Sequence, residues 1–123
     1  MNNKDLIAAY MNAVFVEKDV LKVEGFWGSE MIQHNPTLPN GHDVLRAIIG
    51  KPNPNLKYER GLIAEAGNFV MVHGRYLGWG EKPLVAVDIF RIDNGKIVEH
   101  WDVMQEEVPA AKSVNGNAMF PAE

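Results

Sequence analysis

The sequence contains no cysteine, which excludes disulfide bonds, thiolate nucleophiles and zinc sites built on thiolates. It also lacks any run of the roughly 18–20 apolar residues that span a bilayer as a helix. The most apolar N-terminal stretch, residues 6–16, is interrupted by Asn12 and has neither a strong basic leader nor a cleavage site of small residues. We therefore expect a soluble, cytoplasmic protein with no membrane partner.

Clustered positive charge is missing as well. Lysine and arginine number 12 against 16 acidic residues, giving a formal net charge of −4, and the basic residues are scattered. A protein that binds nucleic acid needs them gathered on one surface, so nucleic acid is a poor partner. The sequence also has no His-x-His or His-Glu-x-x-His spacing, no Gly-x-Ser-x-Gly motif and no phosphate-binding glycine loop, so we expect neither a metal nor a cofactor.

The length fits one domain, residues 1–123, in which residues from about 109 to 123 form an irregular tail. Helices are expected in the first half. Leu6, Ile7, Tyr10, Met11, Val14 and Phe15 recur with helical spacing, and Asn3 is the expected N-cap. A short helix should follow from Val20 to near Gly28, then an extended piece over residues 31–35, then a helix that begins at Asp43.

From Leu56 onward the apolar period changes from 3.6 to 2, which is typical of strands. Short turns at residues 66–68, 80–83 and 93–95 join the candidates into hairpins. Helices followed by a meander predict an α+β domain with its helices on one face of an antiparallel sheet. The four expected strands are Lys57–Ala66, Asn68–Trp79, Leu84–Ile92 and Lys96–Glu106.

Asp88 is the most informative ionisable residue, because apolar side chains flank it on both sides of its strand. Burying a carboxylate costs several kcal/mol unless it is paired, hydrogen-bonded or protonated. Two interpretations remain open. Asp88 is either a structural ion-pair partner of Arg75 or Arg91, or a general acid/base held in an apolar environment.

The neighbour of Asp88 on the next strand depends on the turn at Asp93-Asn94-Gly95. We favour a three-residue loop, in which Ile92 pairs with Lys96 and Asp88 faces His100. A two-residue turn at Asn94-Gly95 would instead place Asp88 opposite Trp101. In the favoured register a carboxylate and an imidazole can share a proton, although a lone buried histidine is more often structural.

The other histidines are weaker candidates. His34 ends an extended piece just before Asn35-Pro36, where a turn can direct it inward. His73 lies in the middle of a strand with Gly74 leaving space beside it, whereas His42 is expected to be a solvated loop residue.

Three segments together resemble the SnoaL-like polyketide cyclase family of the nuclear transport factor 2-like superfamily. The resemblance implies a cone-shaped α+β fold in which a curved antiparallel sheet wraps around helices and encloses a pocket, in homodimers that pair through the sheet. It implies cofactor-free catalysis of an intramolecular aldol condensation, with Asp88 as acid/base and with His34 and His100 pointing toward the pocket. The segments are Gln33-His34-Asn35-Pro36 with Asn40-Gly41, Val87-Asp88-Ile89-Phe90-Arg91, and Asn94 to Val103.

One departure from the family concerns the connection between the two central strands. The cyclases carry a second histidine there in a longer segment, whereas Gly78–Pro83 is short and has none. His73, from the preceding strand, is the expected substitute. This end of the pocket should therefore differ from that of the polyketide cyclases.

These observations predict an enzyme that performs acid/base chemistry next to a carbonyl, as an aldol-type cyclase or a related isomerase or lyase. Asp88, His100 and His34 are the expected catalytic residues, and the ligand is a small hydrophobic carbonyl compound. The alternative is a non-catalytic ligand-binding or dimer-scaffold protein of the same fold. The residues expected to line the binding pocket, besides His73, are Phe15, Trp27, Met31, Phe69, Phe90 and Trp101.

Overall fold

A computed structural model describes residues 1–51 and 53–122. The helices come first: α1 (Asn3–Asn12), the π-helix η1 (Ala13–Glu17) and α2 (Val20–Glu24). An edge strand, β1 (Trp27–Gln33), and the helix α3 (Asp43–Gly50) follow. The meander consists of β2 (Lys57–Ala66), β3 (Phe69–Leu77), β4 (Leu84–Asp93) and β5 (Lys96–Glu106), and a short 3-10 helix, η2 (Ala110–Lys112), lies in the tail.

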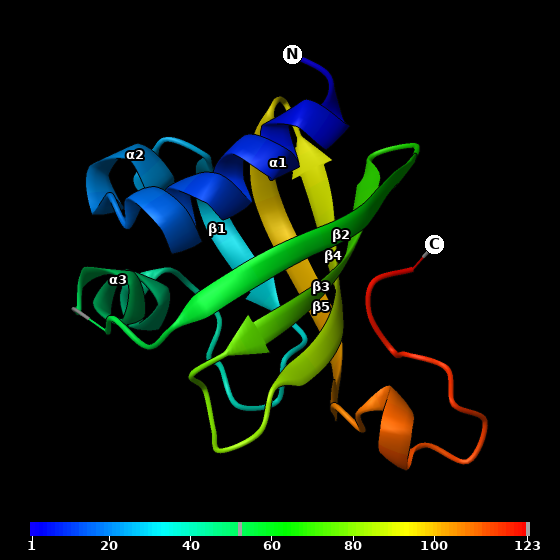
Figure 1. Cartoon of the computed structure of the whole chain (residues 1–123). Helices are drawn as coiled ribbons and strands as arrows, with labels where there is room; N and C mark the ends of the chain where they lie inside the picture. The colour runs from blue at the N-terminus through cyan, green and yellow to red at the C-terminus, as the bar shows by residue number, and fades with distance from the viewer. Residues whose placement is uncertain (52, 123) are drawn as a thin grey trace.

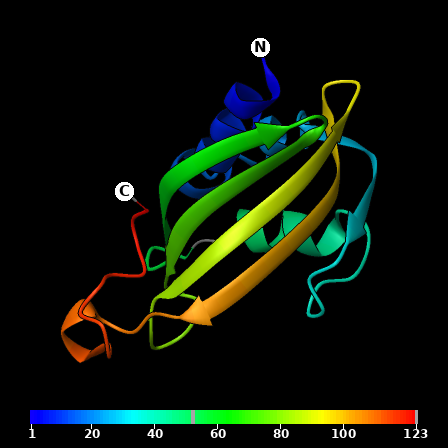
Figure 2. The same cartoon turned by 90° about the vertical axis from the view of Figure 1, so that its right-hand side faces the viewer.

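The strands form one curved sheet in the order β1-β5-β4-β3-β2. Strands β2 to β5 pair antiparallel, as predicted, and β1 adds to the edge parallel to β5. The helices α1, α2 and α3 lie on one face of this sheet (Figure 1). Figure 2 shows the opposite face, which none of these helices covers and which we call the outer face. The expected α+β architecture is confirmed.

Two details of the N-terminal region differ from expectation. The N-cap of α1 is Asn2 rather than Asn3, since the Asn2 side chain accepts a hydrogen bond from the backbone of Asp5. The second helix ends at Glu24 rather than near Gly28, because Trp27 already pairs with Ile97 in the sheet. Sheet pairing thus overrides the helical spacing at this point.

The apolar stripe of α1 packs on the inner face of the sheet and makes the core. Leu6, Ile7, Tyr10 and Met11 are buried on α1, as predicted. They meet a layer from the strands that includes Val70, Val72, Phe90, Ile92 and Ile97. None of the described helices is long and apolar enough to cross a membrane.

The helix α1 continues as the wider π-helix η1, which ends at Lys18 in the left-handed conformation, with φ 52°. Such π-turns are often found at functional sites. Val14 and Phe15 are consecutive residues of η1, and both side chains face the interior of the protein. Phe15 stacks on Tyr58 with ring centroids 5.0 Å apart.

The β4–β5 hairpin corrects both registers considered from the sequence. Its turn has two residues, Asn94 and Gly95, both with positive φ, so Ile92 pairs with Ile97. A β-bulge then shifts the register, and Asp88 lies opposite Asp102 rather than His100 or Trp101. Because side chains alternate along a strand, Asp88, His100 and Asp102 still share the inner face. The extra residue is accommodated at Val98, which is buried next to Ile97.

The tail folds back onto the outer face of the sheet. Phe120 is buried at 6% exposure, and its ring lies 5.4 Å from that of His73 on β3. It also packs against Gly61 of β2 and under the guanidinium of Arg75. The tail is otherwise irregular apart from η2, and residue 123 lies outside the described residues.

Candidate active site

Three ionisable side chains form a polar strip on the inner face of the sheet. Asp88 comes from the centre of β4 and is 2% exposed, and Asp102 lies directly opposite it on β5. His100 contributes the ring between them. Its Nε2 atom is 2.8 Å from Asp88 Oδ1 and 3.8 Å from Asp102 Oδ2. One ligand atom from each residue lies within 4.8 Å of the others, so these are also the residues that could hold a metal ion.

Both ring nitrogens of His100 lie within hydrogen-bond distance of a side-chain oxygen. The Nδ1 atom lies 2.9 Å from Gln33 Oε1 and the Nε2 atom lies 2.8 Å from Asp88 Oδ1, and the tautomer of the ring determines which nitrogen donates. At 2.8 Å, a proton between Nε2 and the Asp88 carboxylate can be shared by the two residues.

Tyr76 completes the environment of Asp88 from β3. Its hydroxyl donates to Asp88 Oδ2 over 2.7 Å. Burial and the charge of Asp88 raise the pKa of Tyr76 well above its usual value of 10. Tyr76 therefore remains a neutral donor at any physiological pH, and both oxygens of Asp88 are occupied by partners that orient the carboxylate.

Asp102 is held from the loop that follows β1. The Asn35 amide nitrogen lies 3.1 Å and 2.8 Å from its two carboxylate oxygens. The Asn35 oxygen accepts from the backbone of Thr37, which fixes the orientation of the amide. Within residues 1–51 and 53–122, neither Asp88 nor Asp102 is paired with lysine or arginine.

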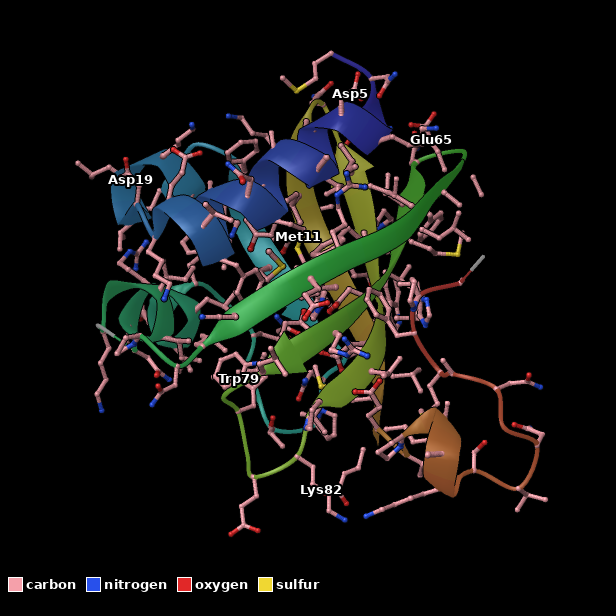
Figure 3. The ribbon with its side chains drawn as sticks, in the orientation of Figure 1. Asp5, Met11, Asp19, Glu65, Trp79 and Lys82 are labelled. Carbon is pink, nitrogen blue, oxygen red and sulfur yellow. The ribbon has the colours of Figure 1, made fainter. Side chains whose placement is uncertain are left out.

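The strip forms one wall of a cavity of about 500 Å³ between the sheet and the helices. The opposite walls are largely apolar, and α3 contributes Val44, Leu45, Ile48 and Ile49. Figure 3 labels two more lining residues: Met11, which projects from α1, and Trp79, on the loop after β3. The cavity therefore combines a polar strip with apolar walls, as small-molecule sites do.

The structure brings five of the sequence-predicted site residues to this cavity: Asp88, His100, Phe15, Met31 and Phe90. Sequence reasoning missed Gln33, Asn35, Tyr76 and Asp102 as parts of the site. Gln33 and Asn35 flank His34 in the first segment of the family resemblance, so the right segment was identified but the wrong side chain was chosen from it. Tyr76 lies in none of the three segments and carries no comparable signal. Asp102 lies in the third segment, two positions after His100 on the same strand, so the alternation of side chains could have placed it on the face of His100.

His34 does not face the cavity, which corrects the expectation from the resemblance. Gln33 points inward, so the next residue along the chain points to the outer face. There the His34 ring stacks on Trp101 with centroids 4.5 Å apart, and its Nε2 atom lies 2.7 Å from a carboxylate oxygen of Glu99. Arg91 donates to the other oxygen of Glu99.

The remaining predicted lining residues also lie elsewhere. His73, Phe69 and Trp101 occupy outward positions of their strands, where His73 meets Phe120, and Phe69 meets Trp101. Trp27 is buried in the core, where its indole N–H donates to the Tyr10 hydroxyl. His42, expected to be solvated, is half-buried and stacks on Trp27.

Replacing Glu99 by glutamine should lower stability only at higher pH. Hydrogen bonds from His34 and Arg91 hold the pKa of Glu99 below its ordinary value of 4.5. A lowered pKa in the folded state stabilises the protein above the unfolded-state pKa, and this contribution is lost as pH falls through the folded-state pKa. For a partly exposed pair we expect a loss of at most about 1 kcal/mol at pH 7. Thermal unfolding of the wild type and of Glu99→Gln from pH 7 down to pH 3 measures this loss. A difference in stability between the two proteins that is equal at every pH would contradict the lowered pKa of Glu99.

Comparison with solved structures identifies the class of fold. The chain is similar to an NTF2-like protein of unknown function from Cytophaga hutchinsonii, with 15% identity over 85% of this chain and 91% of that one, and a TM-score of 0.70. An LEH-like epoxide hydrolase from M. tuberculosis matches with 17% identity, coverage of 92% and 86%, and a TM-score of 0.66. A putative SnoaL-like polyketide cyclase from Shewanella denitrificans matches with 17% identity, coverage of 82% and 88%, and a TM-score of 0.66. At these identities the likeness shows the NTF2-like fold alone.

The family follows from the sequence itself. The family model of the SnoaL-like domain matches residues 7–100, most of the chain, so this chain belongs to the SnoaL-like domain family. The matched region runs from α1 to His100 and contains most of the segments on which the resemblance was based. No curated protein matches the sequence.

Proposed function

We propose that this protein is an enzyme that moves a proton next to a carbonyl group of a small, mostly apolar substrate, without a cofactor. The reaction class is an aldol-type cyclisation, or a related isomerase or lyase reaction. The observation that carries the proposal is the 2.8 Å contact between Asp88 and His100 on the wall of a largely apolar cavity.

The shared proton defines the roles of the two residues. With the proton on His100, Asp88 is a carboxylate and can accept a proton from the carbon beside the carbonyl. The adjacent imidazolium then stabilises the negative charge that develops on the substrate oxygen. Asp88 returns its proton in the second half of the reaction, so the cycle consumes no external acid or base.

The strength of this machinery limits the substrate. A general base contributes about 10²–10⁴-fold and one oxyanion donor about 3 kcal/mol. These contributions suffice for a carbon that is already acidified, such as one between two carbonyl groups. The cavity of about 500 Å³ and its apolar walls suit a molecule with one or more rings.

The alternative of a non-catalytic protein predicted an ion pair between Asp88 and an arginine. Both arginines considered from the sequence have other partners: Arg75 pairs with Glu59 and Glu107, and Arg91 pairs with Glu99. Asp88 is instead bound to a histidine and a tyrosine. This arrangement supports the enzyme, because it leaves the carboxylate beside the cavity and without a permanent cation.

The second copy expected from the family has a suitable surface in the outer face of the sheet. Phe69 is 37% exposed there and Val103 is 71% exposed, on either side of the His34–Trp101 stack. We propose a homodimer that covers these apolar side chains and leaves the cavity, on the inner face, open to ligand.

Solvent deuterium exchange tests the proposed chemistry directly. We expect the wild-type protein to accelerate exchange at the carbon between the two carbonyl groups of a cyclic β-keto ester, which is neutral at pH 7, in D₂O, followed by proton NMR. His100→Gln should lower this rate by about 10²-fold, because the variant loses the shared proton. His34→Gln is the matched control, since it removes a histidine paired with a carboxylate on the outer face. Equal rates in the two variants, or no exchange by the wild type, would refute the proposal.

A further inference from the structure

The carboxylate of Asp102 has fewer hydrogen-bond donors than the carboxylate of Asp88. Asp88 receives one donor on each oxygen, from Tyr76 and His100. Asp102 receives only the Asn35 amide nitrogen among the described residues, and His100 lies beyond hydrogen-bond distance at 3.8 Å. The Asp102 side chain is buried, with 6% of its surface exposed, and it lines the cavity. A carboxylate can accept about four hydrogen bonds, so Asp102 has unused capacity that faces the ligand space.

The charge of the polar strip also indicates that a partner is missing from it. Asp88 and Asp102 are directly opposite each other on neighbouring strands, an arrangement that is unfavourable for like charges. Even when His100 is fully protonated, two carboxylates and one imidazolium leave a net charge of −1. Buried charge of this kind is normally balanced by a partner.

The lysines of the cavity do not supply that partner. Lys18 and Lys51 belong to the helical side, and both are exposed. The Lys18 ammonium donates to the backbone carbonyls of Asn53 and Leu56. The strip thus faces the cavity with an excess of acceptors and of negative charge.

We infer that the ligand presents a hydrogen-bond donor, a hydroxyl or an ammonium group, to Asp102, and that the cavity discriminates against anionic ligands. The inference rests on the proposed function only in taking this cavity as the ligand site. Combined with the carbonyl chemistry of Asp88, it defines the substrate as a neutral or cationic carbonyl compound that also carries a hydroxyl or amino group. Asp102 is then the residue that determines this specificity.

A set of four matched probes tests the inference by isothermal titration calorimetry on the full chain. The probes share a naphthalene ring and differ in one group: 2-naphthylmethanol, 2-naphthylmethylamine, 2-(methoxymethyl)naphthalene and 2-naphthoate. We expect the alcohol and the amine to bind about tenfold more tightly than the ether, because a hydrogen bond to a charged group is lost in the ether. Naphthoate should bind most weakly.

The variant Asp102→Asn should lower the affinity for the amine relative to naphthoate by about tenfold or more. Asp93→Asn is the control, because it changes the net charge equally but lies exposed at the end of β4. If Asp102→Asn folds poorly, the ranking of the four probes by the wild-type protein decides the question alone. A preference for naphthoate, or equal effects of the two variants, would overturn the inference.

This measurement is independent of catalysis. If deuterium exchange fails but the probes rank as expected, the proposed chemistry is wrong and the specificity of Asp102 stands. If exchange depends on His100 but the ranking is reversed, only the inference about Asp102 is wrong. If none of the probes binds, the inference about Asp102 is overturned, and the exchange rates alone decide on the proposed chemistry.

Discussion

Replacing Asp88 by asparagine should lower the rate of deuterium exchange into the cyclic β-keto ester by about 10²–10⁴-fold without disturbing the fold. Asparagine has the same shape and can still accept the Tyr76 hydroxyl proton, so the packing beside β3 is kept. What is lost is the ability to take up a proton from carbon. The measurement is the initial exchange rate by NMR, at matched protein concentration and across pH.

The same substitution also separates catalysis from stability. Asp88 is opposite Asp102, and removing one of two facing carboxylates relieves their repulsion. We therefore expect an unchanged or slightly higher melting temperature, in keeping with the strain that active sites often retain. Asp93→Asn, on the exposed end of the same strand, should leave the exchange rate unchanged. An Asp88→Asn protein that is fully active would remove Asp88 from the mechanism.

The largest stability loss should come from Gly78→Ala, at the end of β3. Gly78 has φ +97°, and a Cβ atom there would run into the backbone of Asn55 and Leu56. An L-residue in left-handed conformation costs about 1–2 kcal/mol, and overpacking against rigid backbone adds about 1–3 kcal/mol. We expect a total of about 2–5 kcal/mol, measured by urea unfolding.

Substitutions at two other glycines measure the conformational cost and the overpacking cost separately. Gly67 also has positive φ, but a Cβ atom added there would have nothing within 4 Å, so Gly67→Ala should show the conformational cost alone. Gly80 has neither restriction, so Gly80→Ala should be neutral or slightly stabilising. If Gly78→Ala costs no more than Gly67→Ala, the close approach of β3 to the segment before β2 is not a determinant of stability.

The sequence predicted the strands of the meander more accurately than the site. The limits of β2 and β5 agree with the structure residue for residue, because period-2 apolar patterning and turn residues mark them locally. The partner of Asp88 was not predictable in this way. It depends on a bulge at Val98, and one extra residue on one strand leaves no signature in a pattern of apolar side chains.

The positions of the histidines were also only partly predictable from the sequence. His100 was placed correctly on the inner face although its register was wrong, because a shift of two positions preserves the face. His34 was misplaced because an extended segment before a turn gives no indication of which neighbour points inward. Gln33, one position earlier, is the residue that contacts His100.

The bulge in β5 also determines where this hairpin can change length during evolution. Val98 is the extra residue between Ile97, which pairs with Ile92, and Glu99, which pairs with Arg91. Loss of the codon for Val98 would remove the bulge and make the pairing of β4 with β5 regular. The Ile92–Ile97 and Arg91–Glu99 pairs would stay in place, so Asp88 would still lie opposite Asp102.

Loss of the codon for Trp101, three positions further on, would have the opposite result. Asp102 would move to the outward position opposite Ile89, and Val103 would take its place beside Asp88. The hairpin therefore tolerates a deletion on the turn side of His100, whereas a deletion beyond it exchanges an acid for an apolar residue in the cavity. One such event would remove the negative charge that we assign to ligand selection, with His100 still facing Asp88.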